Sequence, residues 1–122
     1  MNPASKGRIL VVDDEPGLRK MLSFELVFLG YEVVTAESAD EALEILQREK
    51  FDLVITDVRM PGSMDGIDLV ERRRKEDPQM KVVFITGFAL EEKLDTALKH
   101  PLNRCLKKPF DLNELTTAIT GF

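Results

Sequence analysis

Five short apolar runs recur along the chain, each about five residues long and each separated from the next by a segment of mixed polarity. They cover residues 8–12, 32–36, 53–57, 81–86 and 104–107, of which the last is the weakest. A continuous apolar run of this length is typical of a strand that is buried on both faces of a parallel sheet. The pattern therefore predicts five strands.

The segments between these runs have helical periodicity. In the first of them, Pro16 suits the first turn of a helix and Gly30 suits a left-handed stop. The apolar residues between these two positions keep a spacing of three or four, at Leu18, Leu22, Leu26 and Leu29. This segment is predicted to form a complete helix.

Capping signals place two more helices. Ser38 with Glu41, and Asp111 with Glu114, have the spacing of a capping box. The remaining two helices are predicted in segments 66–75 and 91–99. Strands that alternate with helices imply right-handed crossovers and a parallel sheet covered on both faces, so the predicted fold class is α/β.

The composition limits the number of domains, the cellular location and the kinds of partner that we expect for this chain. The 122 residues, 43% hydrophobic and 32% charged, predict a single domain over residues 1–122. A lone cysteine fits a reducing cytoplasm, and no apolar run approaches the ~18 residues that a membrane span needs. The net charge of -5 argues against direct binding of nucleic acid, which requires a basic surface. We expect a cytoplasmic protein that binds neither membranes nor nucleic acid.

Acidic side chains stand where two of the predicted strands end. Asp13 and Asp14 follow the first strand, and Asp57 ends the third. In an open α/β sheet, ligands bind outside the carboxyl ends of the strands, where the strand order reverses. If the first and third strands are neighbours, the three carboxylates converge, and their repulsion requires a cation or a proton. Oxygen ligands of this kind suit Mg²⁺.

Two further polar residues occupy the same kind of position. Thr86 ends the fourth predicted strand and Lys108 follows the fifth. A carboxylate can attack phosphorus and form an acyl phosphate, while an ammonium and a metal neutralise the oxygens of the transferring group. The hydroxyl of Thr86 can donate a hydrogen bond to one of those oxygens. The set predicts phosphoryl transfer at this edge of the sheet.

Together, these motifs resemble the receiver domain of two-component response regulators. The resemblance extends over about residues 7–120, and it rests on segments 9–15, 57–61, 64–66, 85–87 and 107–110. It implies a flavodoxin-like, doubly wound (βα)5 fold with a five-stranded parallel sheet in the order 2-1-3-4-5. It also implies a phospho-accepting signalling switch rather than an enzyme, with only its own phosphorylation and dephosphorylation to catalyse.

The resemblance assigns a role to each acidic residue. It implies that Asp57 is the phosphoacceptor, and that Asp14, Asp57 and the backbone carbonyl of Arg59 hold Mg²⁺. Asp13 would act on the metal mainly through water.

The resemblance also assigns the groups that bind the phosphoryl oxygens, which are Thr86 and Lys108. The family normally has a cis peptide bond at the position of Lys108-Pro109. In relatives, residues at the positions of Arg59 and Phe88 influence how long the phosphoryl group survives, and both residues are bulky here.

Partners follow from the resemblance as well. The phosphodonor would be a sensor histidine kinase or a histidine phosphotransfer protein. Because the chain ends about three helical turns after Leu112, we expect a single-domain receiver or one excised from a longer chain with an output domain. A homodimer through the fourth helix, fifth strand and fifth helix is a further expectation.

Three features depart from the family pattern. The loop at 60–66 is one residue longer than usual, Cys105 replaces the usual aromatic residue, and 100–103 replaces a small Gly-Ala turn. A thiol cannot substitute by volume for an aromatic ring that moves inward on activation. The departures therefore concern the switch surface and leave the acceptor chemistry intact.

Two other functions compete for the same fold. An aspartate-nucleophile phosphohydrolase typically has an acid two residues after its nucleophile, where this chain has Arg59. A flavin carrier needs a phosphate-binding loop after the first strand, where the acidic segment 13–15 would repel the phosphate.

Several other residues that could suggest a function are interpreted as structural. The basic run at 72–75 surrounds a helix instead of forming one stripe, because consecutive helical residues point about 100° apart. His100 is interpreted as a solvated loop residue, and Cys105 as inert packing in an apolar strand. Four phenylalanines are assigned to the core: Phe24, Phe28, Phe51 and Phe84.

Overall fold

A computed structural model describes residues 5–87 and 92–122 of the chain. The strands are β1 (Arg8–Val12), β2 (Glu32–Ala36), β3 (Leu53–Asp57), β4 (Val82–Thr86) and β5 (Asn103–Lys107). The helices are α1 (Pro16–Phe28), α2 (Ala39–Arg48), α3 (Gly66–Arg74), α4 (Glu92–Ala97) and α5 (Leu112–Ile119). Strands and helices alternate along the chain, which confirms the predicted α/β class.

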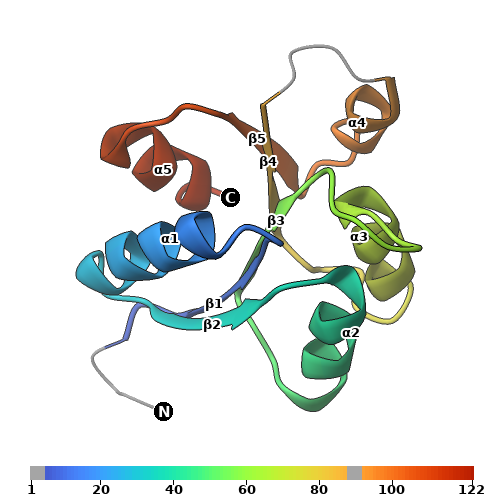
Figure 1. The fold of residues 1–122 in the computed structure, drawn as a ribbon, viewed down its shortest axis with the longest axis horizontal. Helices are drawn as coiled ribbons and strands as arrows, with labels where there is room; N and C mark the ends of the chain where they lie inside the picture. The colour runs from blue at the N-terminus through green and yellow to red at the C-terminus, as the bar shows by residue number, and fades with distance from the viewer. Residues whose placement is uncertain (1–4, 88–91) are drawn as a thin grey trace.

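The five strands form one parallel sheet in the order β2-β1-β3-β4-β5. This order confirms the flavodoxin-like topology that the family resemblance implies. Helices α1 and α5 cover one face of the sheet, and α2, α3 and α4 cover the other (Figure 1). The carboxyl ends of β1 and β3 are therefore neighbours at the point where the strand order reverses.

The core lies in two layers, one on each face of the sheet. Every residue of β4 is buried, as are the first four residues of β3. This burial explains the continuous apolar runs, because a strand with a helix layer on both faces has no side facing water. In the described part of the chain, no helix is both long and apolar enough to span a bilayer.

Local signals explain where most helices begin and end. Pro16 is the first residue of α1, and Gly30 follows that helix with a φ of +101°. The side chains and backbones of Asp111 and Glu114 form the predicted reciprocal capping box. Only half of the first predicted box forms, because Ser38 caps its helix while the Glu41 carboxylate accepts from the backbone N–H of Glu37.

Several predicted boundaries move by one or two residues: α3 ends at Arg74 instead of residue 75, and β4 begins at Val82 instead of residue 81. Helix α4 ends at Ala97 rather than at residue 99, and β5 begins one residue earlier than expected, at Asn103. The side-chain amide of Asn103 donates to the carbonyl of Ala97 at 2.8 Å, and its oxygen accepts from Arg74 at 2.7 Å. These contacts hold the turn between α4 and β5 against the end of α3. Local periodicity cannot predict them, because they join residues that are distant in the sequence.

The assignment of two phenylalanines to the core is wrong. Phe24 and Phe28 lie on the outer side of α1 and are 77% and 73% exposed, whereas Phe84 is fully buried. Helix α1 is apolar on more than one side, and it turns Leu22 and Leu26 toward the sheet. Spacing alone does not decide which apolar side of such a helix faces the core.

The interpretation of Cys105 as buried packing is also wrong, because the thiol residue is exposed. Cys105 lies on the edge strand β5, where alternate side chains point to opposite faces of the sheet. His100 is half-buried, and its Nδ1 accepts a hydrogen bond from the backbone of Leu102 at 3.1 Å. The imidazole therefore stabilises the turn before β5, and it is less solvated than expected.

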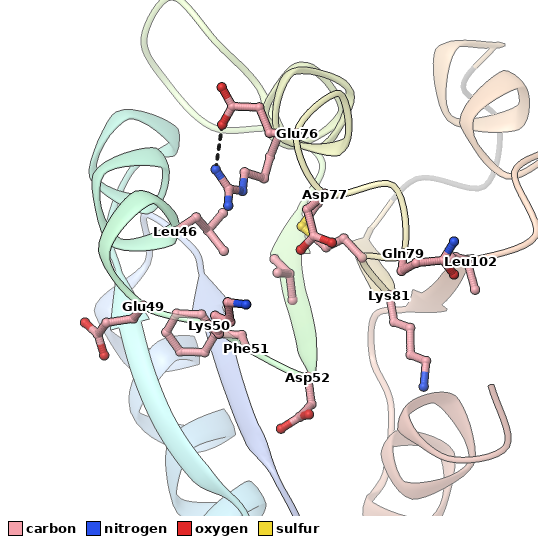
Figure 2. Close-up of a pocket in the computed structure, with 13 residues that line it drawn as sticks. Leu46, Glu49, Lys50, Phe51, Asp52, Glu76, Asp77, Gln79, Lys81 and Leu102 are labelled. Atoms are coloured by element: carbon pink, nitrogen blue, oxygen red, sulfur yellow. Dashed lines mark hydrogen bonds and ion pairs between the residues drawn. The ribbon is translucent and has the colours of Figure 1, made fainter. Parts of the chain in front are cut away.

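The basic run does not form one charged stripe, as expected. Arg74 turns inward to the carbonyl of Met80 at 2.7 Å, and Arg73 pairs with Glu76 at 2.8 Å. A pocket of about 520 Å³ lies beside this run, at the amino ends of β3 and β4 (Figure 2). The pocket therefore lies at the amino ends of the strands, whereas the predicted site lies at their carboxyl ends.

Candidate functional site

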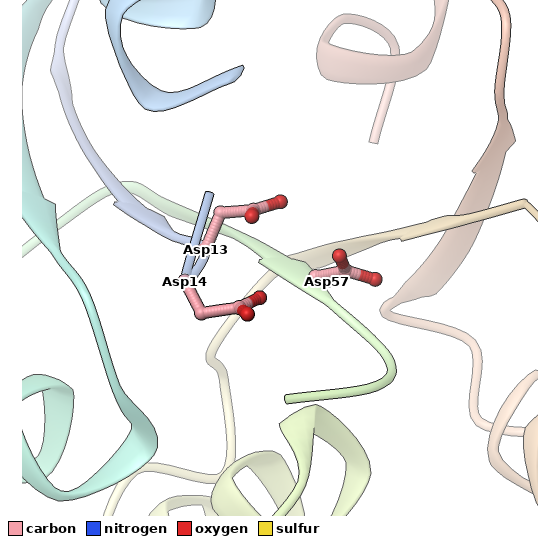
Figure 3. A group of neighbouring side chains, drawn as sticks. All are labelled: Asp13, Asp14 and Asp57. Atoms are coloured by element: carbon pink, nitrogen blue, oxygen red, sulfur yellow. The ribbon is translucent and has the colours of Figure 1, made fainter. Parts of the chain in front are cut away.

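Three carboxylates meet at the carboxyl ends of β1 and β3. Asp13 and Asp14 directly follow β1, and Asp57 is the last residue of β3. The two strands pair directly, with Val12 opposite Thr56, so the residues after them lie together (Figure 3). One carboxylate oxygen from each of the three aspartates lies within 4.8 Å of the others. The structure thus confirms the predicted convergence.

Asp13 is the most buried member of this cluster, with 1% of its surface exposed. Its Oδ1 accepts a hydrogen bond from the backbone N–H of Glu15 at 2.8 Å, while its buried Oδ2 has no hydrogen-bond partner within the described residues. Burial, and secondarily the nearby charge of Asp57, raise the pKa of Asp13 from 3.8 to about 6. A cation at this position would offset the cost of burying the Asp13 charge, and it would give the buried Oδ2 a partner.

Lys108 faces Asp57 directly. Its Nζ lies 3.1 Å from Oδ2 of Asp57, and the Asp57 side chain is only 13% exposed. The backbone N–H of Lys108 donates to the carbonyl of Thr86 at 2.8 Å, which holds the residue at the end of the sheet. The Lys108-Pro109 peptide bond is cis, as expected from the family resemblance.

The two remaining predicted residues lie at the same edge of the sheet. Thr86 ends β4 and is 4% exposed, and Arg59 is exposed in the loop that follows β3. That loop is anchored at both ends, because Val58 donates its N–H to Ile85 at 3.1 Å and accepts from the N–H of Gly66 at 2.9 Å. Asp57 is thus held as the last residue of β3, directly before this loop.

Some residues that shape the site escape sequence reasoning. The Nη1 of Arg19 donates to the carbonyl of Asp13 at 2.7 Å, from the first turns of α1. Thr56 donates through Oγ1 to the carbonyl of Asp57 at 3.0 Å. No sequence motif marks either residue, because a hydrogen bond from a side chain to a backbone carbonyl places no requirement on the type of the accepting residue.

A second cluster connects α3 with α4. The Nζ of Lys93 lies 2.8 Å from a carboxylate oxygen of Asp65 and 2.8 Å from one of Asp68. Asp65 and Asp68 also form a reciprocal capping box at the start of α3, in addition to the two capping boxes predicted from the sequence. The two carboxylates raise the pKa of Lys93, and hydrogen bonding from Lys93 lowers the pKa of Asp68.

The donor set fits a hard divalent cation. All three side chains that converge offer carboxylate oxygens, and one of those oxygens is buried without a partner in the described structure. Mg²⁺ takes one or two carboxylates and keeps several waters, so a partly open acidic cluster suits it. Its charge would offset the mutual repulsion of the three aspartates.

Comparisons with known proteins agree with this geometry. The family model of the response regulator receiver domain matches residues 9–120. The response regulator receiver protein CpdR of Brucella abortus is 40% identical over 113 residues, which cover 92% of both chains. The transcriptional regulatory protein GlrR of Escherichia coli is 43% identical over 111 residues, which cover 91% of this chain and 25% of GlrR. This chain thus spans about a quarter of the length of that longer relative.

Solved structures show the same fold. The response regulator TrrA of Thermotoga maritima, solved in complex with Mg²⁺ and BeF, superimposes with a TM-score of 0.81 and 36% identity over 90% of this chain and 93% of that chain. A receiver domain protein of Methanospirillum hungatei superimposes with a TM-score of 0.84 and 34% identity, covering 92% and 89% of the two chains. Since the family match extends over nearly the whole chain and a relative of similar length shares two residues in five, this chain belongs to the response regulator receiver domain family and is a phospho-accepting switch of two-component signalling.

Proposed function

We propose that Asp57 is the residue that accepts the phosphoryl group, from a phosphohistidine of a sensor kinase or phosphotransfer protein. The observation that carries this proposal is the 3.1 Å contact between Lys108 Nζ and Asp57 Oδ2, beside the convergent oxygens of Asp13 and Asp14. Asp57 is the only one of the three carboxylates with an ammonium contact of this kind among the described ion pairs.

The proposed reaction is an in-line displacement at phosphorus. A carboxylate oxygen of Asp57 forms a bond to phosphorus as the bond from phosphorus to the donor imidazole nitrogen breaks, and that nitrogen keeps the electron pair. Lys108 neutralises charge on the phosphoryl oxygens, and the Thr86 hydroxyl donates a hydrogen bond to one of them. The product is an acyl phosphate on Asp57, which later loses its phosphoryl group to water without an additional catalyst.

Asp14, Asp57 and the backbone carbonyl of Arg59 are the groups that we propose to hold Mg²⁺, with Asp13 acting mainly through water. When bound, the ion supplies positive charge to the phosphoryl oxygens. Asp13 contributes a buried carboxylate next to Asp57, and a bound cation would offset the burial and the Asp57 charge that raise the pKa of Asp13.

Signalling, rather than turnover of a separate substrate, is the proposed role. A phosphohydrolase would need a general acid two residues after Asp57, and the residue there is the cation Arg59, which is exposed. We propose that the phosphorylated chain acts in the cytoplasm by presenting a changed surface to an output domain or a partner protein.

Phosphorylation by a small donor tests the acceptor. Purified chain is incubated with acetyl phosphate in Mg²⁺ or in EDTA, and the intact mass is measured. We expect one added phosphoryl group in Mg²⁺ alone, none in Asp57→Asn, and full labelling of Asp40→Asn, an exposed aspartate on α2. Labelling that persists in Asp57→Asn, or that does not depend on Mg²⁺, would contradict the proposed site.

A further inference from the structure

The large apolar side chains that are exposed in the described structure all lie on one helix, α1. Phe24 is 77% exposed, Phe28 73%, Val27 59% and Met21 40%. The face expected for dimerisation, formed by α4, β5 and α5, has no exposed side chain of this kind among its described residues. A pocket of about 590 Å³ lies along Met21, Phe24 and Phe28 and reaches Leu112 at the start of α5. An apolar surface of this kind marks an interaction site.

The exposed residues follow the spacing of a two-stranded helical pair. Gly17, Met21, Phe24 and Phe28 are separated by four, three and four positions, which is the alternation of the a and d positions of a heptad. A Cβ added to Gly17 meets nothing within 4 Å, so one end of this row offers room for close approach. Leu22 and Leu26, which anchor α1 to the sheet, lie on the opposite side of the helix.

Opposite charges flank the row at one specific spacing. Lys20 precedes Met21 and is exposed, and Glu25 follows Phe24 and is half-buried. In a parallel pair of helices, the residue before an a position meets the residue five places later on the other helix. Lys20 of one copy would therefore reach Glu25 of the second copy, and the symmetric contact would form as well.

We propose that two copies of this chain dimerise through a parallel pairing of α1, with Met21, Phe24 and Phe28 against their own equivalents and Lys20 against Glu25. Such a contact is isologous, with the two-fold axis parallel to α1. The pairing does not involve Asp57, so it holds or fails independently of phosphorylation.

The area involved indicates a weak dimer. A fully buried phenylalanine removes about 200 Å² from water, so the two exposed rings offer roughly 300 Å² in each copy. Met21 and Val27 raise this to roughly 450 Å², and a dimer would then bury about 900 Å² in total, close to the lower limit for biological interfaces of about 1,000 Å². We expect a dissociation constant in the micromolar range.

Sedimentation velocity on the unphosphorylated chain tests the pairing. The wild type should shift from monomer to dimer between about 1 and several hundred micromolar, and Phe24→Ser with Phe28→Ser should remain monomeric at an unchanged unfolding midpoint. Lys20→Glu and Glu25→Lys should each weaken the dimer about tenfold, and the double charge swap should restore it. Lys75→Glu, an exposed change of the same charge at the end of α3, should have no effect.

A cysteine crosslink tests the orientation. In a Cys105→Ser background, Gly17→Cys keeps both rings and should form an intermolecular disulfide much faster than Lys75→Cys, because only a parallel pair places residue 17 opposite itself. A wild type that is monomeric at every concentration, a dimer that is unaffected by loss of the two rings, or no restoration by the charge swap would each overturn the proposal. Equal crosslinking of the two cysteine variants would overturn it too.

Discussion

A Cβ atom added to Gly66 would lie 2.0 Å from the backbone carbonyl oxygen of Asp57. The first residue of α3 therefore packs directly against the main chain of the proposed phosphoacceptor. The Oγ1 of Thr56 is the next neighbour, at 2.9 Å from the same position. Only glycine allows this close approach, which fixes the return of the loop from Asp57 to α3.

Gly66→Ala should consequently be among the most destabilising small substitutions in the chain. We expect a loss of about 2–4 kcal/mol in the free energy of unfolding, because the backbone of β3 or α3 must move to admit the methyl group. Urea denaturation at low protein concentration measures this change. Gly17→Ala is the matched control: it meets open space within helix α1 and should stabilise the chain by about 0.5–1 kcal/mol. Equal stability of Gly66→Ala and the wild type would refute the packing argument.

Asp13 makes the stability of the metal-free protein depend on pH. Its pKa is about 6 in the folded chain and 3.8 ordinarily, so the folded state binds more protons between these two values. The free energy of unfolding should fall as pH rises from about 4 to about 6 and stay low above, by up to about 3 kcal/mol.

Asp13→Asn tests this dependence, because the amide cannot ionise and can still accept from the N–H of Glu15. In EDTA, the variant should be more stable than the wild type at pH 7.5, and the difference should vanish near pH 4. Urea denaturation at the two pH values measures it, with Asp40→Asn as the exposed control. Mg²⁺ should stabilise the wild type more than the variant. A variant that is less stable at pH 7.5 would contradict the burial argument.

Cys105 should limit the response of the β5 face to phosphorylation. A thiol buries far less area than an aromatic ring, so an inward ring movement has no equivalent here. We expect the signal to travel mainly through α4, which Lys93 links to Asp65 at the start of α3. We also expect phosphorylation to order segment 86–90, of which residues 88–90 lie outside the described part of the chain.

Amide chemical shifts with and without beryllofluoride and Mg²⁺ measure this response. Wild-type shifts should be small from residue 104 to 110 and larger in α4, and Cys105→Tyr should enlarge those on β5. Lys93→Ala should reduce the shifts in α4. Large wild-type shifts throughout β5 and α5 would show that the switch works without its aromatic ring.

The phosphoryl group on Asp57 should be long-lived. Arg59 is bulky and exposed beside the acceptor, and Phe88, which lies outside the described residues, is bulky as well. Both should hinder the placement of a water in line with the phosphorus. Arg59→Asn with Phe88→Glu should lose the phosphoryl group several-fold faster, as measured by the intact mass over time after removal of the donor. Loss at the wild-type rate would count against this explanation.

The sequence alone determines the element order and the chemistry of the site. Strands buried on both faces have to be continuously apolar, so β1, β3 and β4 are visible as runs. The acidic residues follow those runs, and the parallel topology brings strand ends to one edge. Asp13, Asp14 and Asp57 are therefore predictable as a cluster before any distance is known.

The tertiary structure decides what depends on contacts between distant segments. Three features of the site depend on contacts between separate elements. They are the burial of Asp13, the close approach of Gly66 to Asp57, and the ion pairs of Lys93. The outward position of Phe24 and Phe28 belongs to the same class, because α1 has two apolar sides and only packing selects the one that faces the sheet. Local periodicity reports the average environment of a segment, whereas orientation and burial depend on neighbours far away in the chain.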